Sequence, residues 1–127
     1  MNLLLDTNAY SDFVRGDTTR IELIQTAQTI FLPLIVLAEL RAGFAAGNQE
    51  LKNAAILQQF LNSPRVTILS PNEQTTHHYA QIYAQLRKSN QKIPSNDIWI
   101  AALAIQHDLI LCTSDQHFSY LCQLITC

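Results

Sequence analysis

Two aspartates follow short apolar runs, where α/β proteins commonly bind their ligands. Asp6 comes directly after residues 3–5, and Asp115 comes two residues after the run 109–113. Short continuous apolar runs predict strands that are covered on both faces. Ligands bind beyond the carboxyl ends of such strands. Each aspartate also has a purely local interpretation, a helix cap for Asp6 and a turn residue for Asp115.

The other two acidic candidates, Glu39 and Asp97, fall in predicted helices. Glu39 is the only polar side chain between residues 30 and 40, so we expect it to project from a mostly buried helix. A buried carboxylate must find a cation or take up a proton. That cation is either an arginine such as Arg41 or a metal ion. Asp97 falls in the first turn of an apolar helix, where the helix dipole alone already favours a carboxylate.

Together, the four carboxylates predict a site for divalent metal ions. If they met in one place they would repel each other strongly unless cations lay among them. Oxygen ligands suit hard ions, chiefly Mg²⁺ or Mn²⁺, and a site that needs no Cys or His argues against zinc. Mg²⁺ held by carboxylates usually acts on phosphate esters, where it orients water and neutralises the leaving oxygen. The expected chemistry is therefore hydrolysis of a phosphate ester.

The rest of the chain alternates between predicted strands and helices. Alternation of this kind implies parallel strands joined by right-handed helical crossovers. We therefore predict the α/β class, as a three-layer α/β/α sandwich around a mostly parallel sheet of four to five strands. The apolar runs that predict these strands cover residues 3–5, 30–32, 66–69, 109–113 and, less regularly, 122–126.

Helix boundaries and faces are marked by caps and by apolar spacing. Asp17 and Asn72 are predicted to open helices, and Ser95 or Asn96 is predicted to cap the helix from about residue 97. A stripe at helical spacing predicts one buried face. Its members are Tyr79, Ile82, Tyr83 and Leu86.

Composition limits the class of protein. The chain has 127 residues, is 48% hydrophobic and has a net charge of −2, which excludes disorder and predicts one domain over residues 1–127. Every apolar run is shorter than the roughly 18 residues of a membrane span, and no signal peptide is expected. The three cysteines form no CxxC motif, which favours free thiols in a cytoplasmic protein. When the four candidate acids are set aside, the chain has eight basic and six acidic residues. This charge balance neither requires nor excludes a nucleic-acid partner.

Four segments resemble the ordered motifs of PIN domains. The resemblance covers nearly the whole chain, and its length is most similar to the VapC-type toxins of bacterial toxin–antitoxin pairs. Any single motif is weak, but four in the right order are specific. The motifs are LLLDTN at residues 3–8, LAELRAG at 37–43, PSNDIWIAALA at 94–104 and LCTSDQHF at 111–118.

The resemblance implies a single PIN-like domain with Mg²⁺- or Mn²⁺-dependent endoribonuclease activity. It implies that Asp6 and Asp97 are the main metal ligands and that Glu39 and Asp115 complete the catalytic, metal-binding quartet. The implied partners are an RNA substrate, a cognate antitoxin protein and a second copy of the chain as a homodimer, with no membrane. The supporting polar positions that match the family are Asn8 and a hydroxyl at Thr113 or Ser114.

Two further questions stay open from the sequence. Basic residues near the expected site could guide an RNA backbone, although the spacing favours a solvated helix end and loop as their explanation. The alternative functions are a catalytically silent PIN-like module that binds RNA or protein, and a haloacid-dehalogenase-like phosphatase. The phosphatase chemistry requires a second Asp two residues after Asp6, where Asn8 stands. His117 could contact the substrate, although a local turn role is favoured for it. The candidate RNA-binding residues are Arg87, Lys88, Lys92, Arg15 and Arg41.

Overall fold

A parallel sheet of four strands forms the centre of the protein, in a computed structural model that describes residues 1–127. The strand order is β3-β2-β1-β4, and each neighbouring pair is parallel. Because β1 has a partner on each side, Leu3, Leu4 and Leu5 are completely buried, which explains their continuous apolar run. The strands are β1 (Asn2–Leu5), β2 (Thr29–Pro33), β3 (Val66–Leu69) and β4 (Ile110–Cys112).

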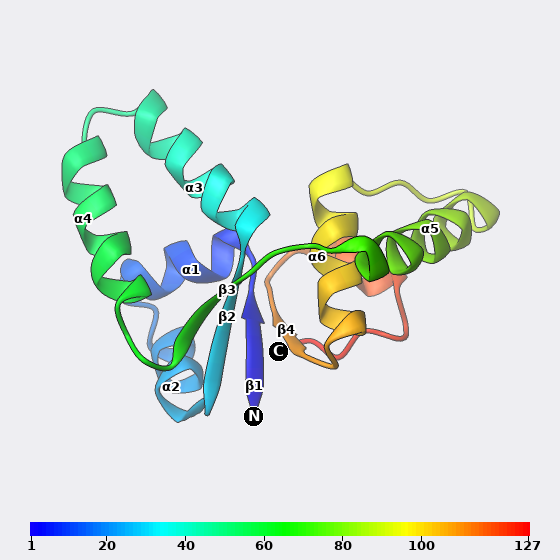
Figure 1. Ribbon diagram of the computed structural model, residues 1–127, viewed down its shortest axis with the longest axis horizontal. Helices are drawn as coiled ribbons and strands as arrows, with labels where there is room; N and C mark the ends of the chain where they lie inside the picture. The colour runs from blue at the N-terminus through cyan, green and yellow to red at the C-terminus, as the bar shows by residue number, and fades with distance from the viewer.

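Six α-helices flank this sheet. In Figure 1, α1 to α4 lie on one side of the strands, and α5 and α6 lie on the other. The predicted three-layer α/β/α architecture is therefore confirmed, with four strands. The helices are α1 (Thr7–Val14), α2 (Thr18–Thr26), α3 (Leu34–Ala46), α4 (Glu50–Leu61), α5 (Glu73–Lys88) and α6 (Ser95–Gln106), followed by the 3₁₀ helix η1 (Gln116–Tyr120).

The segment 122–126 does not form a fifth strand, although its sequence predicts one. It makes a single parallel bridge between Leu111 and Thr126. Most of its side chains are exposed, so it lacks the buried apolar face that would stabilise a full strand against β4.

Two of the three predicted caps are confirmed. The Asp17 carboxylate accepts from the Arg20 backbone N–H at 3.0 Å, and Asn72 forms a capping box with Thr75. Neither Ser95 nor Asn96 caps α6, so that prediction is wrong. Pro94 is the N-cap residue, no side chain caps the helix, and the Pro94 carbonyl accepts the backbone N–H of Asp97 at 3.0 Å.

The burial of the helices follows the prediction only in part. α6 is largely buried, as expected, and Ile82 and Leu86 of α5 face the core. Tyr83, predicted to join that face, is 47% exposed. α3 is also less buried than expected, since Leu34 is 46% exposed and only one side of the helix meets the core. No helix has the length and apolar character needed to cross a bilayer.

Candidate active site

The four acidic residues singled out in the sequence line one pocket of about 410 Å³. Asp6 follows the end of β1, and Asp115 lies beyond the end of β4, its direct neighbour in the sheet. α3 contributes Glu39 and the first turn of α6 contributes Asp97. Strands and helices far apart in the chain therefore deliver four carboxylates to one place. The remaining lining residues are Thr7, Asn8, Pro94, Ser95, Asn96 and Ile100.

Asp6 has both a structural role and a place in the pocket. Its side chain caps α1 by accepting the Ala9 backbone N–H at 2.8 Å. The other carboxylate oxygen accepts the hydroxyl of Thr113. With the residue only 5% exposed, these two bonds fix the carboxylate at the pocket wall. The cap and the ligand-site interpretations of Asp6 are therefore compatible.

Glu39 is held by a hydroxyl and not by a cation. Thr7 Oγ1 donates to Glu39 Oε1 at 2.7 Å, and Glu39 forms no ion pair with Arg41 or any other basic side chain. The sequence left two possible partners for Glu39, an arginine or a metal ion, and the structure shows no arginine paired with it. The carboxylate reaches the pocket with its charge uncompensated by protein.

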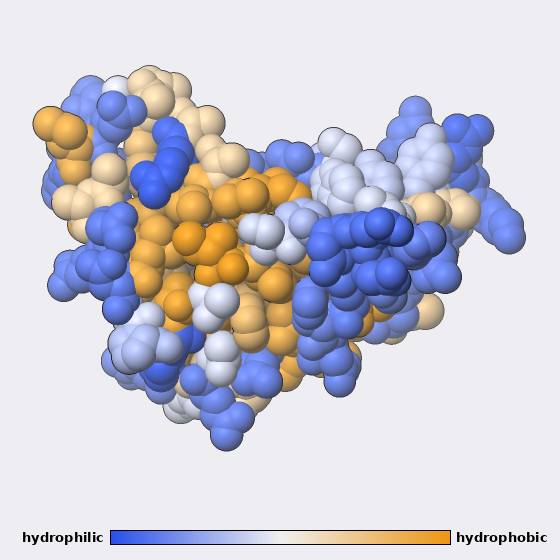
Figure 2. All heavy atoms as spheres, in the orientation of Figure 1, coloured by the Kyte–Doolittle hydropathy of each residue, from blue (hydrophilic) through white to orange (hydrophobic).

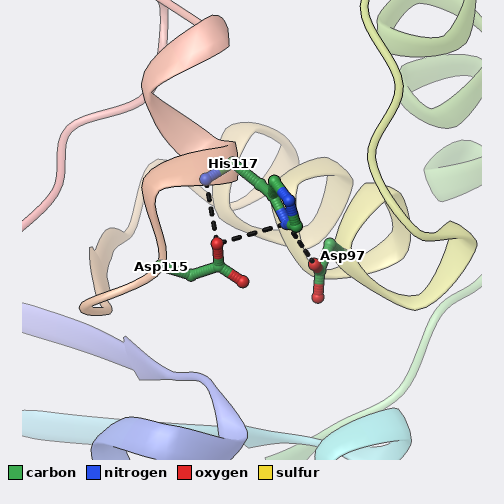
Figure 3. Close-up of side chains that lie close together, drawn as sticks. All are labelled: Asp97, Asp115 and His117. Carbon is green, nitrogen blue, oxygen red and sulfur yellow. Dashed lines mark hydrogen bonds and ion pairs between the residues drawn. The ribbon is translucent and has the colours of Figure 1, made fainter.

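Asp97, Asp115 and His117 cluster together at the pocket. Figure 3 shows His117 between the two carboxylates. Its Nδ1 lies 3.2 Å from Asp115 Oδ1 and 3.8 Å from Asp97 Oδ2. Asp115 caps η1 by accepting the His117 backbone N–H at 2.9 Å, and that turn brings the imidazole back over the carboxylate. His117 therefore joins this cluster as well as the local turn predicted for it.

The carboxylates disfavour one another's charge. Burial, followed by the charges of Asp115 and Glu39, raises the pKa of Asp97 to about 6. Burial also raises the pKa of Asp6, although the hydrogen bonds from Thr113 and Ala9 and the charge of Arg20 partly oppose it. An acidic site with this much self-repulsion is stabilised by positive charge placed among its oxygens.

The donor set fits a hard divalent cation. One ligand atom from each of Asp97, Asp115 and His117 lies within 4.8 Å of the others, and Asp6 and Glu39 present further oxygens to the same pocket. Carboxylate oxygens are the ligands that Mg²⁺ and Mn²⁺ prefer. The pocket is thus chemically suited to the predicted class of ion.

Arg20 is a residue of this region that sequence reasoning missed. It is only 8% exposed, and its guanidinium donates to Ser114 Oγ at 2.6 Å, to Cys112 Sγ at 2.9 Å and to the Cys127 carbonyl at 3.2 Å. It forms no ion pair, so it supplies positive charge close to the acidic pocket. The apolar spacing of residues 18–26 gives no signal for this burial.

The supporting polar positions divide between two locations. Asn8 lines the pocket, and Thr113 donates to Asp6. Ser114 is bound to Arg20 and does not line the pocket. Of the two hydroxyls considered from the sequence, Thr113 is therefore the one that contacts the acids.

The basic candidates lie at several distinct places. Arg87 and Lys92 line a groove of about 480 Å³ between the end of α5 and the loop before α6. Lys88 is exposed on the neighbouring surface of α5. Arg15 pairs with Asp12 at 2.9 Å, and Arg41 is exposed on α3. Lys92 and Arg41 are close to the pocket along the chain, each two residues from a lining residue, Pro94 and Glu39 respectively. The groove adjoins the pocket in the sequence, because Ile93 lines the groove and Pro94 lines the pocket.

The electrostatics predict a pH dependence of stability for the protein kept free of metal by a chelator. An aspartate whose pKa rises on folding binds its proton more tightly in the folded state, so the free energy of unfolding falls as pH rises. For Asp97 the free energy of unfolding falls between pH 3.8, the usual pKa of an aspartate, and about pH 6, its pKa in the folded protein. Above that pH the loss of stability is complete. We expect Asp97→Asn to raise the free energy of unfolding at pH 7 by about 1–2 kcal/mol. Urea unfolding at pH 4 and pH 7 measures this, and an equal effect at both pH values would contradict it.

Comparison with known proteins identifies relatives across the chain. The model of the PIN domain family matches residues 3–124. Ribonuclease VapC2 of Haemophilus influenzae is 31% identical over 117 residues, which cover 91% of this chain and 87% of that protein. Ribonuclease VapC2 of Rickettsia felis is 30% identical over 119 residues, with the same coverage of 91% and 87%.

Solved structures agree with this likeness over the full fold. VapBC2 of Rickettsia felis, bound to a DNA fragment from their promoter, superposes with a TM-score of 0.88 at 27% identity, covering 99% of this chain and 97% of that one. VapBC-1 of nontypeable Haemophilus influenzae also gives a TM-score of 0.88, at 26% identity, covering 100% and 97%. The likeness therefore extends from the motifs to the arrangement of the whole chain.

Proposed function

Because this chain belongs to the PIN domain family, we propose that it is a Mg²⁺- or Mn²⁺-dependent endoribonuclease, the toxin of a toxin–antitoxin pair. The observation that carries the proposal is the convergence of Asp6, Glu39, Asp97 and Asp115 on one pocket at the carboxyl ends of β1 and β4. The relatives named VapC ribonuclease support the reaction class. RNA is accordingly the substrate.

In this proposal each acid has a defined part in holding the ion. Asp6 and Asp97 are its main ligands, and Glu39 and Asp115 complete the set directly or through water. Thr113 holds the Asp6 carboxylate, and Thr7 orients Glu39 through its hydroxyl. Such outer hydrogen bonds fix the orientation of the metal ligands, and their loss typically lowers metal affinity or activity about 10–100-fold.

The proposed reaction is hydrolysis of an RNA phosphodiester by water. A bound divalent ion supplies a water of lowered pKa and neutralises charge on the phosphate oxygens. The protein's own contribution is to hold four carboxylates close together despite their repulsion. A cation held by them would neutralise this charge, so that the RNA phosphate would not be repelled from the pocket. Asn8, exposed at the pocket edge, is placed to hydrogen-bond the substrate.

We further propose that RNA enters along the groove beside the pocket. Arg87 and Lys92 give this groove positive charge, and Tyr83 presents a half-exposed ring on which a base can stack. The Arg87 guanidinium lies 6.0 Å from the centre of that ring. Cationic grooves with aromatic platforms bind single-stranded RNA by phosphate contact and stacking.

This path gives a prediction for charge reversal. Arg87→Glu and Lys92→Glu should weaken RNA binding and flatten its salt dependence, by about 0.7 in the log–log slope for each phosphate that is no longer neutralised. Lys52→Glu on α4 makes the same charge change outside the groove and is the control. Fluorescence anisotropy with labelled RNA across a salt series measures both quantities. An identical slope in all three variants would exclude the groove as the RNA path.

The proposed protein partners are a cognate antitoxin and a second copy of the chain. The neighbouring solved structures of VapBC complexes support the antitoxin. Figure 2 shows an apolar area over β2, β3 and the start of α3, where Leu34 and Ile68 are 46% and 42% exposed. Contiguous exposed apolar surface commonly marks protein interfaces. Both partners are testable by co-expression and by mass measurement in solution.

The proposed function is tested by incubating the purified chain with RNA in Mn²⁺, in Mg²⁺ and in excess chelator. We expect internal cleavage with either metal and none with chelator. Undiminished cleavage in chelator would reject the metal mechanism. RNA binding without cleavage would favour the silent PIN-like module, and hydrolysis of para-nitrophenyl phosphate would favour the phosphatase.

A further inference from the structure

Outside the acidic pocket, two cysteines lie side by side on adjacent extended segments. Leu111 pairs with Thr126 in parallel register, so Cys112 and Cys127 are the next pair and point to the same face. Three backbone hydrogen bonds hold the segments together: Leu111 to Ile125 at 2.8 Å, Cys127 to Leu111 at 2.9 Å and Thr113 to Cys127 at 3.2 Å. Paired strands are about 4.8 Å apart, which falls within the Cα separation of about 4.4–6.8 Å found for disulfides.

The two cysteines differ in exposure. Cys112 is fully buried, whereas Cys127 is exposed. Cys127 is therefore open to a reagent in solution, and the buried Cys112 is its neighbour on the adjacent segment.

Arg20 completes the cluster by placing a cation against Cys112 Sγ and the backbone oxygen of Cys127. Its guanidinium donates to Cys112 Sγ at 2.9 Å and to the Cys127 carbonyl at 3.2 Å. The neighbouring Cys112 thiol and the charge of Arg20 outweigh the effect of burial and lower the pKa of Cys127 to about 7. A thiolate at an exposed position beside a second thiol is the arrangement that favours disulfide exchange.

We propose that Cys112 and Cys127 are a redox modification site that forms an intramolecular disulfide by exchange with a low-molecular-weight disulfide such as oxidised glutathione. The Cys127 thiolate attacks one sulfur of glutathione disulfide, and the S–S bond breaks to release one glutathione thiolate. The Cys112 sulfur then attacks Cys127 Sγ and expels the second glutathione thiolate. The two thiol protons pass to the two glutathione thiolates, so two protein thiols and one disulfide become one protein disulfide and two glutathione thiols.

The proposed bond lies next to the acidic pocket without using any of its groups. Thr113, which follows Cys112, donates to Asp6, and Arg20 joins the thiol pair to Ser114. A disulfide would link the segment 125–127 covalently to β4, next to the contact between Thr113 and Asp6. The inference stands on the pairing and surroundings of these two cysteines and does not depend on the proposed ribonuclease activity.

The test uses the full chain, exposed to oxidised glutathione, with alkylation and peptide mapping by mass spectrometry. Cys122→Ser is the matched control, because Cys122 is also exposed but has no thiol partner. We expect wild type and Cys122→Ser to yield a Cys112–Cys127 linkage with no glutathione retained on Cys127. Cys112→Ser should stop at a glutathione adduct on Cys127, and Cys112→Ala provides the same arrest if the serine variant folds poorly.

Thermal melting gives a second readout. The oxidised Cys122→Ser protein should melt several degrees above its reduced form and return to the reduced midpoint with dithiothreitol. A stable glutathione adduct on Cys127 in Cys122→Ser, a linkage between Cys122 and Cys127 in wild type, or no reaction at all would each overturn the proposal.

Discussion

Asp97→Asn is expected to lower the rate of RNA cleavage more than about 100-fold at saturating Mg²⁺, since even outer partners of metal sites cost about 10–100-fold when removed. Asparagine keeps the size and one oxygen of the side chain but removes the charge that holds the cation. In the protein without metal the same change should stabilise the fold, because burial and the charges of Asp115 and Glu39 disfavour the ionised Asp97. Loss of activity and gain of stability from one substitution would be difficult to explain by misfolding.

The matched control for this prediction is Asp12→Asn. Asp12 is an aspartate on α1 that pairs with Arg15 at the surface and does not line the pocket. It should retain wild-type cleavage. Cleavage by Asp97→Asn within a few fold of wild type would remove Asp97 from the proposed mechanism.

The second large effect is expected at Asp6, where two roles can be separated by comparing two neutral substitutions. Asp6→Asn and Asp6→Ala should both abolish cleavage to the same extent, since each removes a main ligand of the proposed ion. Asparagine still accepts the Ala9 N–H that caps α1, whereas alanine cannot. Asp6→Ala should therefore be less stable than Asp6→Asn by about 0.5–2 kcal/mol, the usual value of a helix cap.

Asp17 provides the control, because it caps α2 through the Arg20 backbone N–H but lies outside the pocket. The same pair of substitutions at Asp17 should reproduce the stability difference while cleavage is retained. Parallel urea unfolding and cleavage assays measure both effects. Cleavage that followed stability across all four variants would show that Asp6 acts only as a cap.

The fold and the pocket acids were predictable because their signals are local. Leu3, Leu4 and Leu5 form an uninterrupted apolar run because β1 has a strand on each side. Once the strands are known to be parallel, residues that follow them must share one edge of the sheet, which brings Asp6 near Asp115. Glu39 was marked by being the only polar side chain in its apolar segment.

The features that sequence reasoning missed depend on contacts between distant segments. Nothing in residues 18–26 indicates that Arg20 reaches across to Cys112 and Ser114, 92 and 94 positions away. His117 joins Asp97 only because the turn of η1 folds back over the pocket. Tyr83 has the spacing of a core residue but lies at a groove. Periodicity predicts which way a side chain points from its own element and not what packs there.

Direct titration with Mn²⁺ tests, without RNA, whether the four pocket carboxylates bind a divalent cation. Electron paramagnetic resonance of free Mn²⁺ measures binding to wild type, Asp97→Asn, Glu39→Gln and the surface control Asp12→Asn. We expect saturable binding by wild type and Asp12→Asn, and affinity lowered by about 10-fold or more in the two pocket variants. Equal affinity in all four proteins, or no saturable binding by wild type, would contradict the account.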